Sequence, residues 1–214
     1  MFQKLKNRIT DFLNESADHT AFELPLFPLN TVLFPGGILP ARVFEQRYMD
    51  MTKACLSDNT PFGICYIKEG SEVGIPATPH NIGCLAKIID WDMQQLGVLN
   101  IKALGLRRFQ VLETRTEPDG LIIASARLLP LEPELPLPTE HAACASVLKH
   151  IVERVGEDKF ELPLKYDDAV WVGYRLAEVL PIKLSAKQNM LEMNDTVVRL
   201  EVLHRFLTQQ GLAT

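Results

Sequence analysis

Short apolar runs separated by turn-forming residues fill the chain from Glu23 to Leu128. The runs are rich in Val, Ile, Leu and Phe, and Pro, Gly, Asn and Asp recur between them, which is typical of strands. The predicted strands include Ile38–Val43, Phe62–Ile67, Cys84–Asp90, Val98–Leu104, Arg108–Leu112 and Leu121–Leu128. Short strands with turns between them favour an α+β protein in which an antiparallel sheet closes toward a barrel.

Helical periodicity interrupts this pattern at two places in the first part of the chain. Apolar residues recur every three or four positions within residues 1–22, so we expect a short amphipathic helix in this N-terminal extension. Such a helix could contact a partner or a membrane surface, but packing on its own domain is the more common use. Phe44, Tyr48, Met51 and Cys55 share a second period, which predicts a helix over about Glu45–Leu56.

A proline-rich segment separates the predicted strands from a helical region. Residues 130–138 contain four prolines, which remove backbone donors and exclude a regular helix or a central strand. We therefore expect a β-rich domain over residues 23–129, a linker over 130–138 and a helical bundle over 139–211. Four helices are predicted there, with caps or capping boxes that begin at Thr139, Asp167, Ser185 and Asp195.

Composition and charge narrow the class of partner. The 214 residues carry a net charge of −5, so no overall positive field attracts nucleic acid. Signal-peptide and membrane-spanning patterns are absent, because charged residues interrupt the apolar stretches, and we expect a cytoplasmic protein. The cysteines have no C-x-x-C spacing and are read as reduced core residues.

A long phrase near the start of the chain resembles a known family. Leu24–Leu29, Val32–Gly36 and Leu39–Pro40 read LPLFPL, VLFPG and LP, as at the opening of the Lon protease N-terminal domain. Phe44–Tyr48 then resembles the F-E-x-R-Y of that family, and Phe62–Gly63 opens a strand at the expected distance. The phrase is long and specific, so it is unlike a chance match of one short motif.

Later motifs extend the resemblance to about Leu207. Ile82–Ile88 is similar to the V-G-T-x-A-x-I strand of the family, with Cys84 in place of Thr, and Gly105–Phe109 matches G-x-R-R-F. Leu176–Pro181 and Lys187–Glu192 resemble the L-A-x-L-L-P and K-Q-x-L-L-E of its helical part. The resemblance implies a PUA-like β-barrel followed by a helical bundle, and a substrate-binding domain that recognises protein chains.

Candidate binding residues lie within these motifs. A recognition surface needs accessible apolar side chains with a polar rim. The peptide-binding candidates are Phe34, Phe44, Glu45, Arg47, Tyr48, Arg107 and Arg108. All of them also have structural explanations, since the phenylalanines are apolar anchors and the charged residues can form internal ion pairs.

The chain lacks the catalytic motifs that accompany this domain in full-length Lon proteases. There is no G-x-x-x-x-G-K-[ST] phosphate loop, no P-K-D-G-P-S-A-G stretch and no G-x-S-x-G elbow. The five histidines show no metal-binding spacing, so neither a metal nor another cofactor is predicted. We expect a non-catalytic module that binds unfolded polypeptide or a protein partner; the alternative is a PUA-like binder of nucleic acid or a small ligand.

Overall fold

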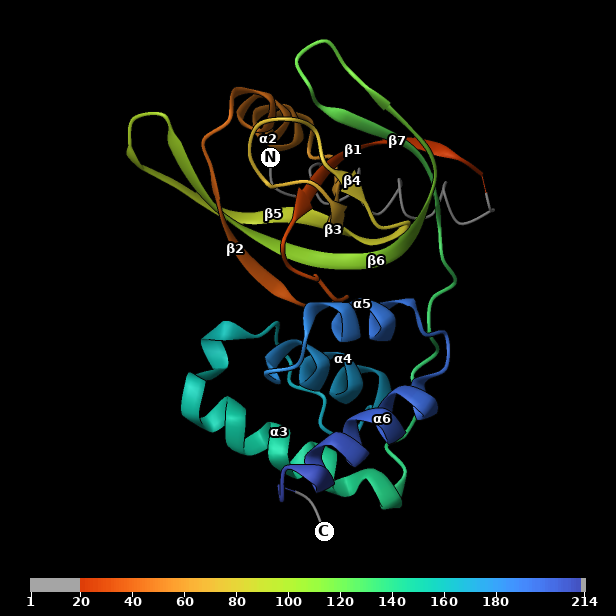
Figure 1. Cartoon of the computed structure of the whole chain (residues 1–214). Helices are drawn as coiled ribbons and strands as arrows, with labels where there is room; N and C mark the ends of the chain where they lie inside the picture. Colours follow the sequence, from red (N-terminus) through yellow and green to blue (C-terminus); the bar gives the residue numbers. More distant parts are fainter. Residues whose placement is uncertain (1–19, 213–214) are drawn as a thin grey trace. The chain divides into compact units, whose positions relative to one another are not determined.

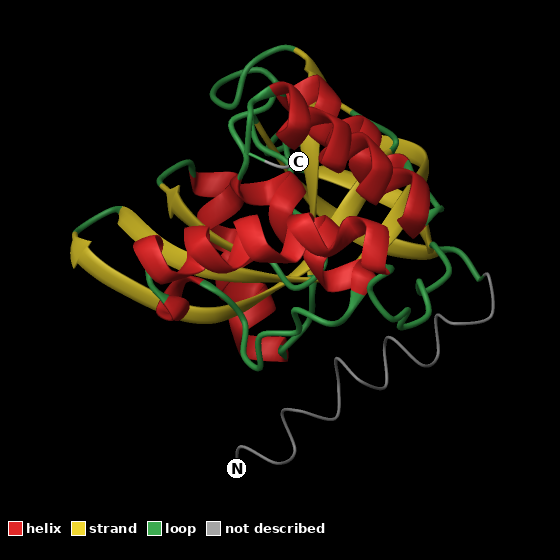
Figure 2. Ribbon diagram, turned by 90° about the horizontal axis from the view of Figure 1, so that it is seen from below, coloured by secondary structure: helices red, strands yellow, loops and turns green. Residues whose placement is uncertain are grey.

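The computed structural model describes residues 20–212, which form two compact units that divide between Pro130 and Leu131 (Figure 1). The helix expected within the N-terminal extension falls almost wholly outside the described residues. The first unit holds the named strands and the helix α2 (Gln46–Asp58), while the second holds the other described helices, as the labels of Figure 1 show. Figure 2 shows the strands in yellow and the helices in red.

The described part of the first unit is built on one mixed sheet of seven strands. They are β1 (Phe22–Leu29), β2 (Ile38–Val43), β3 (Phe62–Glu69), β4 (Thr78–Pro79), β5 (Ile82–Gln95), β6 (Val98–Thr116) and β7 (Ile122–Leu128). Neighbours follow the order β1-β7-β6-β5-β3-β4, and a further pairing of β1 with β3 closes a ring. β2 lies off this ring and, among the described strands, pairs with β6 alone.

The sheet differs from the expected one because it is not wholly antiparallel. β1 and β3 run parallel, with Leu26 opposite Gly63 and Leu29 opposite Tyr66. Parallel neighbours need a long connection, and the chain between these two strands supplies it with β2 and α2. The wholly antiparallel arrangement predicted above is therefore corrected at this one pairing.

β1 was not among the predicted strands, because Pro25 and Pro28 interrupt its sequence. Its first half pairs only with β7 and its second half only with β3, with Leu26 shared by both pairings. Each half is thus an edge strand on one side, and a proline can direct its missing N–H to the unpaired side. The two prolines are accommodated by this change of partner.

β6 joins two predicted strands into one. Val98–Leu104 and Arg108–Leu112 were expected as separate strands, with a turn signal at Gly105 between them, but β6 runs without a break from Val98 to Thr116. Gly105 does not form a turn but binds the segment before β2. Its N–H donates to the carbonyl of Gly37, and its own carbonyl accepts from the N–H of Gly36, each at 2.8 Å. A Cβ at this position would lie 2.2 Å from the carbonyl oxygen of Phe34.

The helix α2 begins and ends close to the prediction and packs on the sheet through the expected stripe. Tyr48, Met51 and Cys55 are buried in a core shared with β1, β3, β5 and β6. The ring centroid of Tyr48 lies 4.5 Å from that of Phe27 in β1. Phe44, which precedes the helix, remains 54% exposed and is outside this core.

The second unit contains four α-helices and two short 3-10 turns. The helices are α3 (Ala142–Val155), α4 (Ala169–Val179), α5 (Leu184–Glu192) and α6 (Thr196–Gln209), and the turns are η1 (Thr139–His141) and η2 (Glu157–Lys159). Asp195 caps α6 as predicted, accepting from the N–H groups of Val197 and Val198. Three expected caps are wrong: α3 and α5 begin without a side-chain cap, and Asp168 rather than Asp167 caps α4.

A buried ion pair joins the proline-rich segment to the helices of this unit. Glu132 accepts hydrogen bonds from the hydroxyl groups of Tyr174 and Thr196 and from the guanidinium of Arg199. The side chain of Arg199 is fully buried, and its guanidinium carbon lies 4.1 Å from the ring centroid of Tyr174. Buried charges are tolerated only when they are paired and hydrogen-bonded, as this pair is.

This network makes the stability of the protein depend on pH. Burial would raise the pKa of Glu132, but the hydrogen bonds and charge of Arg199 outweigh it and hold that pKa below its ordinary value of 4.5. A carboxyl group whose pKa is lower in the folded than in the unfolded state stabilises the fold, and this effect is complete above the unfolded-state pKa. It is lost as the pH falls through the folded-state pKa. We expect the difference in unfolding free energy between the wild type and Glu132→Gln to shrink below about pH 4.5.

Urea denaturation of both proteins between neutral pH and pH 3 measures this difference. Other carboxyl groups titrate in both proteins and cancel in the comparison. A difference that stays constant over the whole range would show that the charge of Glu132 does not stabilise the fold.

Candidate functional site

The seven candidate residues from the sequence do not form a single exposed surface. Phe34, Arg47, Tyr48 and Arg108 are buried, Glu45 and Arg107 are partly buried, and Phe44 is exposed. Burial raises the pKa of the Tyr48 phenol, which keeps this side chain neutral inside the core. Of the seven, Phe44 has the accessible apolar surface that a binding role needs.

Glu45 and Arg47 form an internal ion pair at the start of α2. Their closest charged atoms are 2.9 Å apart, and Arg47 also donates to the carbonyl of Gly120 at 3.1 Å. Glu45 accepts from the N–H of Gly74 at 3.3 Å, and the Arg47 guanidinium carbon lies 4.7 Å from the ring centroid of Tyr48. The pair thus links the helix start to two loops.

The basic residues of β6 do not supply a free basic cluster. Arg107 donates to the carbonyl of Leu129 at 2.9 Å, and burial lowers its pKa. Lys102 is paired with Asp90 at 2.9 Å, and Arg115 with Glu117 at 3.0 Å. These contacts occupy the side chains on which a nucleic-acid interface would depend.

A surface hollow of about 530 Å³ lies over three neighbouring strands of the first unit. We call it the β2 hollow; it is lined by Pro40–Arg42 of β2, Asp90–Asp92 of β5 and Asn100–Lys102 of β6. These three segments are paired residue by residue, with Pro40 opposite Lys102 and Lys102 opposite Asp90. Directly paired residues share a face of the sheet, so the hollow is lined by two polar cross-strand rows.

The two rows differ in whether their charged side chains form ion pairs. In the first row Lys102 donates to Asp90, which lowers the pKa of that carboxyl. The second row runs from Arg42 through Asn100 to Asp92. Among residues 20–212 neither Arg42 nor Asp92 has an ion-pair partner, so the row presents one free cation and one free anion.

A second, narrower hollow adjoins the first at Arg42. We call it the Phe44 hollow; its lining residues are Phe27, Leu29, Arg42–Glu45, Tyr48 and Glu72–Val73. Most of this lining is apolar, and Phe44 and Val73 are each 54% exposed at its rim. Arg42 is the residue that lines both hollows.

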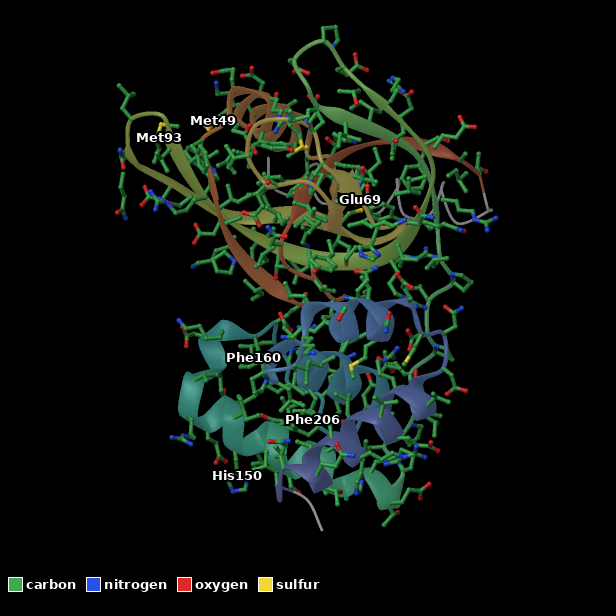
Figure 3. All side chains as sticks on the ribbon, viewed as in Figure 1. Met49, Glu69, Met93, His150, Phe160 and Phe206 are labelled. Atoms are coloured by element: carbon green, nitrogen blue, oxygen red, sulfur yellow. The ribbon has the colours of Figure 1, made fainter. Side chains whose placement is uncertain are left out.

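Exposed apolar side chains also lie on the long β5–β6 hairpin, which extends past β2 (Figure 1). Trp91 is 56% exposed and Leu96 is 95% exposed. Met93 is near the tip of the hairpin (Figure 3) and is 41% exposed. The sequence did not single out these residues, because they lie between the predicted strands Cys84–Asp90 and Val98–Leu104.

The described residues offer little for catalysis or metal binding. No group of three or more His, Cys, Asp or Glu side chains within residues 20–212 is placed to hold a metal ion. The four cysteines are buried, and burial raises the pKa of Cys55 and Cys144 to about 11, which keeps these thiols protonated. Within the same residues, no helix combines the length and apolar character needed to cross a membrane.

Comparison with known proteins gives one consistent result. The model of the ATP-dependent protease La (LON) substrate-binding domain matches residues 23–209. A crystal structure of a Lon N-terminal domain protein from Xanthomonas campestris aligns with a TM-score of 0.72 and 34% identity, covering 85% of this chain and 96% of that one. The likeness therefore extends over both units.

Curated relatives match over a part of their own length. A Lon protease from Anaeromyxobacter dehalogenans is 27% identical over 87% of this chain and 23% of the relative. Protein cereblon from Xenopus tropicalis is 27% identical over 63% of this chain and 30% of the relative. The chain thus spans less than a third of either relative.

Proposed function

Because the chain belongs to the family of the ATP-dependent protease La (LON) substrate-binding domain, we propose that it is a non-catalytic recognition module that binds unfolded segments of other proteins. The matched region is the substrate-binding domain, with neither an ATPase nor a protease motif beside it in the sequence. The protein would hold polypeptide segments without ATP.

One observation carries this proposal: large apolar residues of the β5–β6 hairpin are exposed. Trp91 is paired with Ile101, on the face of the sheet opposite the two polar rows, and Met93 follows it two residues later in the same strand. Burying large apolar side chains is the main favourable term in most protein association. An unfolded segment also exposes apolar side chains, so packing them against Trp91 and Met93 removes apolar surface of both partners from water.

The alternative, a PUA-like binder of nucleic acid, gains no support from the contacts of the basic residues. Arg107, Lys102 and Arg115 are each engaged by a carbonyl or a carboxylate. The PUA-like class of the sheet, the bundle in the second unit and the cytoplasmic location stay predictions from the sequence.

We expect the double variant Trp91→Ala, Met93→Ala to bind an unfolded model protein at least about tenfold more weakly than the wild type. The loss follows from removing two exposed apolar side chains of β5, which are 56% and 41% exposed. Fluorescence anisotropy with a labelled, reduced and alkylated protein measures it in the absence of ATP.

The matched control removes exposed apolar side chains elsewhere. Val155 and Leu162 of the second unit are 48% and 64% exposed, and Val155→Ala with Leu162→Ala should leave binding unchanged. Equal binding by the hairpin variant and the wild type would exclude the hairpin as the recognition surface.

A further inference from the structure

The outer edge of β2 is the open strand edge beside both hollows. β2 pairs with β6 along one side, and no strand within residues 20–212 pairs with its other side. Gly37, just before the strand, accepts from Gly105 of β6. Backbone direction alternates along a strand, so Leu39 and Ala41 also face β6, while Ile38, Pro40 and Arg42 face the outer edge.

The side chains on this edge agree with that alternation. Pro40 has no N–H to donate, which suits a position directed away from β6. Pro40 and Arg42 are both exposed, and within residues 20–212 no backbone hydrogen bond from an element other than β6 reaches them. The edge therefore presents the N–H of Arg42 and the carbonyl groups of Pro40 and Arg42, which are groups that an extended polypeptide satisfies.

Charge and shape on the two faces of β2 specify the side chains of the incoming segment. A residue opposite Arg42 shares its face, where the guanidinium has no ion-pair partner among the described residues. The next residue of the segment points to the other face, beside Val43 and the mostly apolar Phe44 hollow. An acidic side chain fits the first position and an apolar one fits the second.

From these observations we propose that the outer edge of β2 takes an extended polypeptide segment as an added strand. An acidic side chain of the segment lies opposite Arg42, and the adjacent apolar side chain packs at the rim of the Phe44 hollow, against the exposed Phe44 and Val73. This rests on the proposed function and adds to it the conformation and side-chain pattern of the bound segment.

A second copy of the chain is a poorer occupant of this edge. A symmetric pairing of two β2 strands centred on Pro40 would lack both central N–H donors. A pairing centred on Arg42 would place two guanidinium groups directly opposite each other, which is destabilising. A foreign segment with an acidic residue avoids both difficulties.

The probe is a labelled eight-residue peptide in which Val and Glu alternate. Two control peptides are compared with it: one in which Val and Lys alternate, and one with the Val and Glu sequence that is N-methylated at alternate residues. We expect the full-length wild type to bind the first peptide at least about tenfold more tightly than the other two. N-methylation removes backbone donors and leaves the side chains in place, so it tests strand addition on the unaltered protein.

Charge reversal tests the position of the acidic residue. The Arg42→Glu variant should bind the Glu peptide at least about tenfold more weakly than the wild type does, and it should bind the Lys peptide more tightly. Arg205→Glu is the control, since Arg205 is an exposed arginine on α6 whose side chain is 78% accessible. Circular dichroism and thermal unfolding of both variants establish that they fold.

The possible results distinguish strand addition at β2 from the proposed function on which it rests. Equal binding of the N-methylated and parent peptides, or an Arg42→Glu variant that behaves as wild type, overturns strand addition at β2. If the wild type still captures unfolded protein through Trp91 and Met93 in that case, the proposed function stands without it. A dimer in light scattering that Arg42→Glu abolishes would identify a second copy as the occupant and also overturn the proposal.

Discussion

Replacing Glu132 with Gln lowers the free energy of unfolding by about 3 to 5 kcal/mol, because it leaves a buried arginine without its counter-charge. Gln keeps the shape of the side chain and one acceptor oxygen, whereas Glu132 uses one oxygen for Tyr174 and the other for Thr196. The loss therefore combines the missing charge next to Arg199, whose side chain has no solvent exposure, with the exchange of one acceptor oxygen for an NH2 group. Urea denaturation at neutral pH, followed by far-ultraviolet circular dichroism, measures it.

Two further variants show whether the buried charge is the cause. Glu134→Gln removes the carboxylate of a surface pair with Lys165, two residues further along the same segment, and should leave the transition midpoint almost unchanged. Arg199→Met added to Glu132→Gln removes the orphaned charge and should recover part of the lost stability. If Glu134→Gln and Glu132→Gln had equal effects, the buried network would have no special role.

The sequence predicted the helices of the second unit better than their ends. Asp195 stands where a cap was expected and accepts from two backbone N–H groups. Asp167 and Asp168 are adjacent, and the sequence pattern did not distinguish them; Asp168 is the cap, while the carbonyl of Asp167 accepts from Leu137 in the proline-rich segment. That long-range contact decides the register, and local patterns do not contain it.

The candidate site was harder to predict because exposure depends on tertiary structure. The periodicity that places Tyr48 on the inner face of α2 is local, and the structure confirms it. The exposure of Trp91 and Met93 depends instead on how far β5 and β6 extend beyond β2. Arg42 looked ordinary in the sequence, and only the structure shows that its guanidinium has no ion-pair partner within residues 20–212.

The glycine of the G-x-R-R-F motif shows what a sequence resemblance leaves unexplained. Gly105 matches that motif, but nothing in the motif says why glycine is needed. In the fold, its backbone bonds to Gly36 and Gly37 bring the segment before β2 against β6, and the Phe34 carbonyl occupies the place of a side chain. The requirement is a close approach of two backbones.

Gly105→Ala should therefore lower the free energy of unfolding by at least about 3 kcal/mol, because backbone atoms rather than a flexible side chain would have to move. The added Cβ would lie 2.2 Å from the Phe34 oxygen. Gly173→Ala in α4 is the matched control: its Cβ would meet the Arg199 side chain at 3.3 Å, and the helix favours alanine. We expect that control to stay within about 1 kcal/mol of the wild type in urea denaturation. Similar losses in the two variants would mean that the contact between Gly105 and Phe34 does not hold β2 against β6.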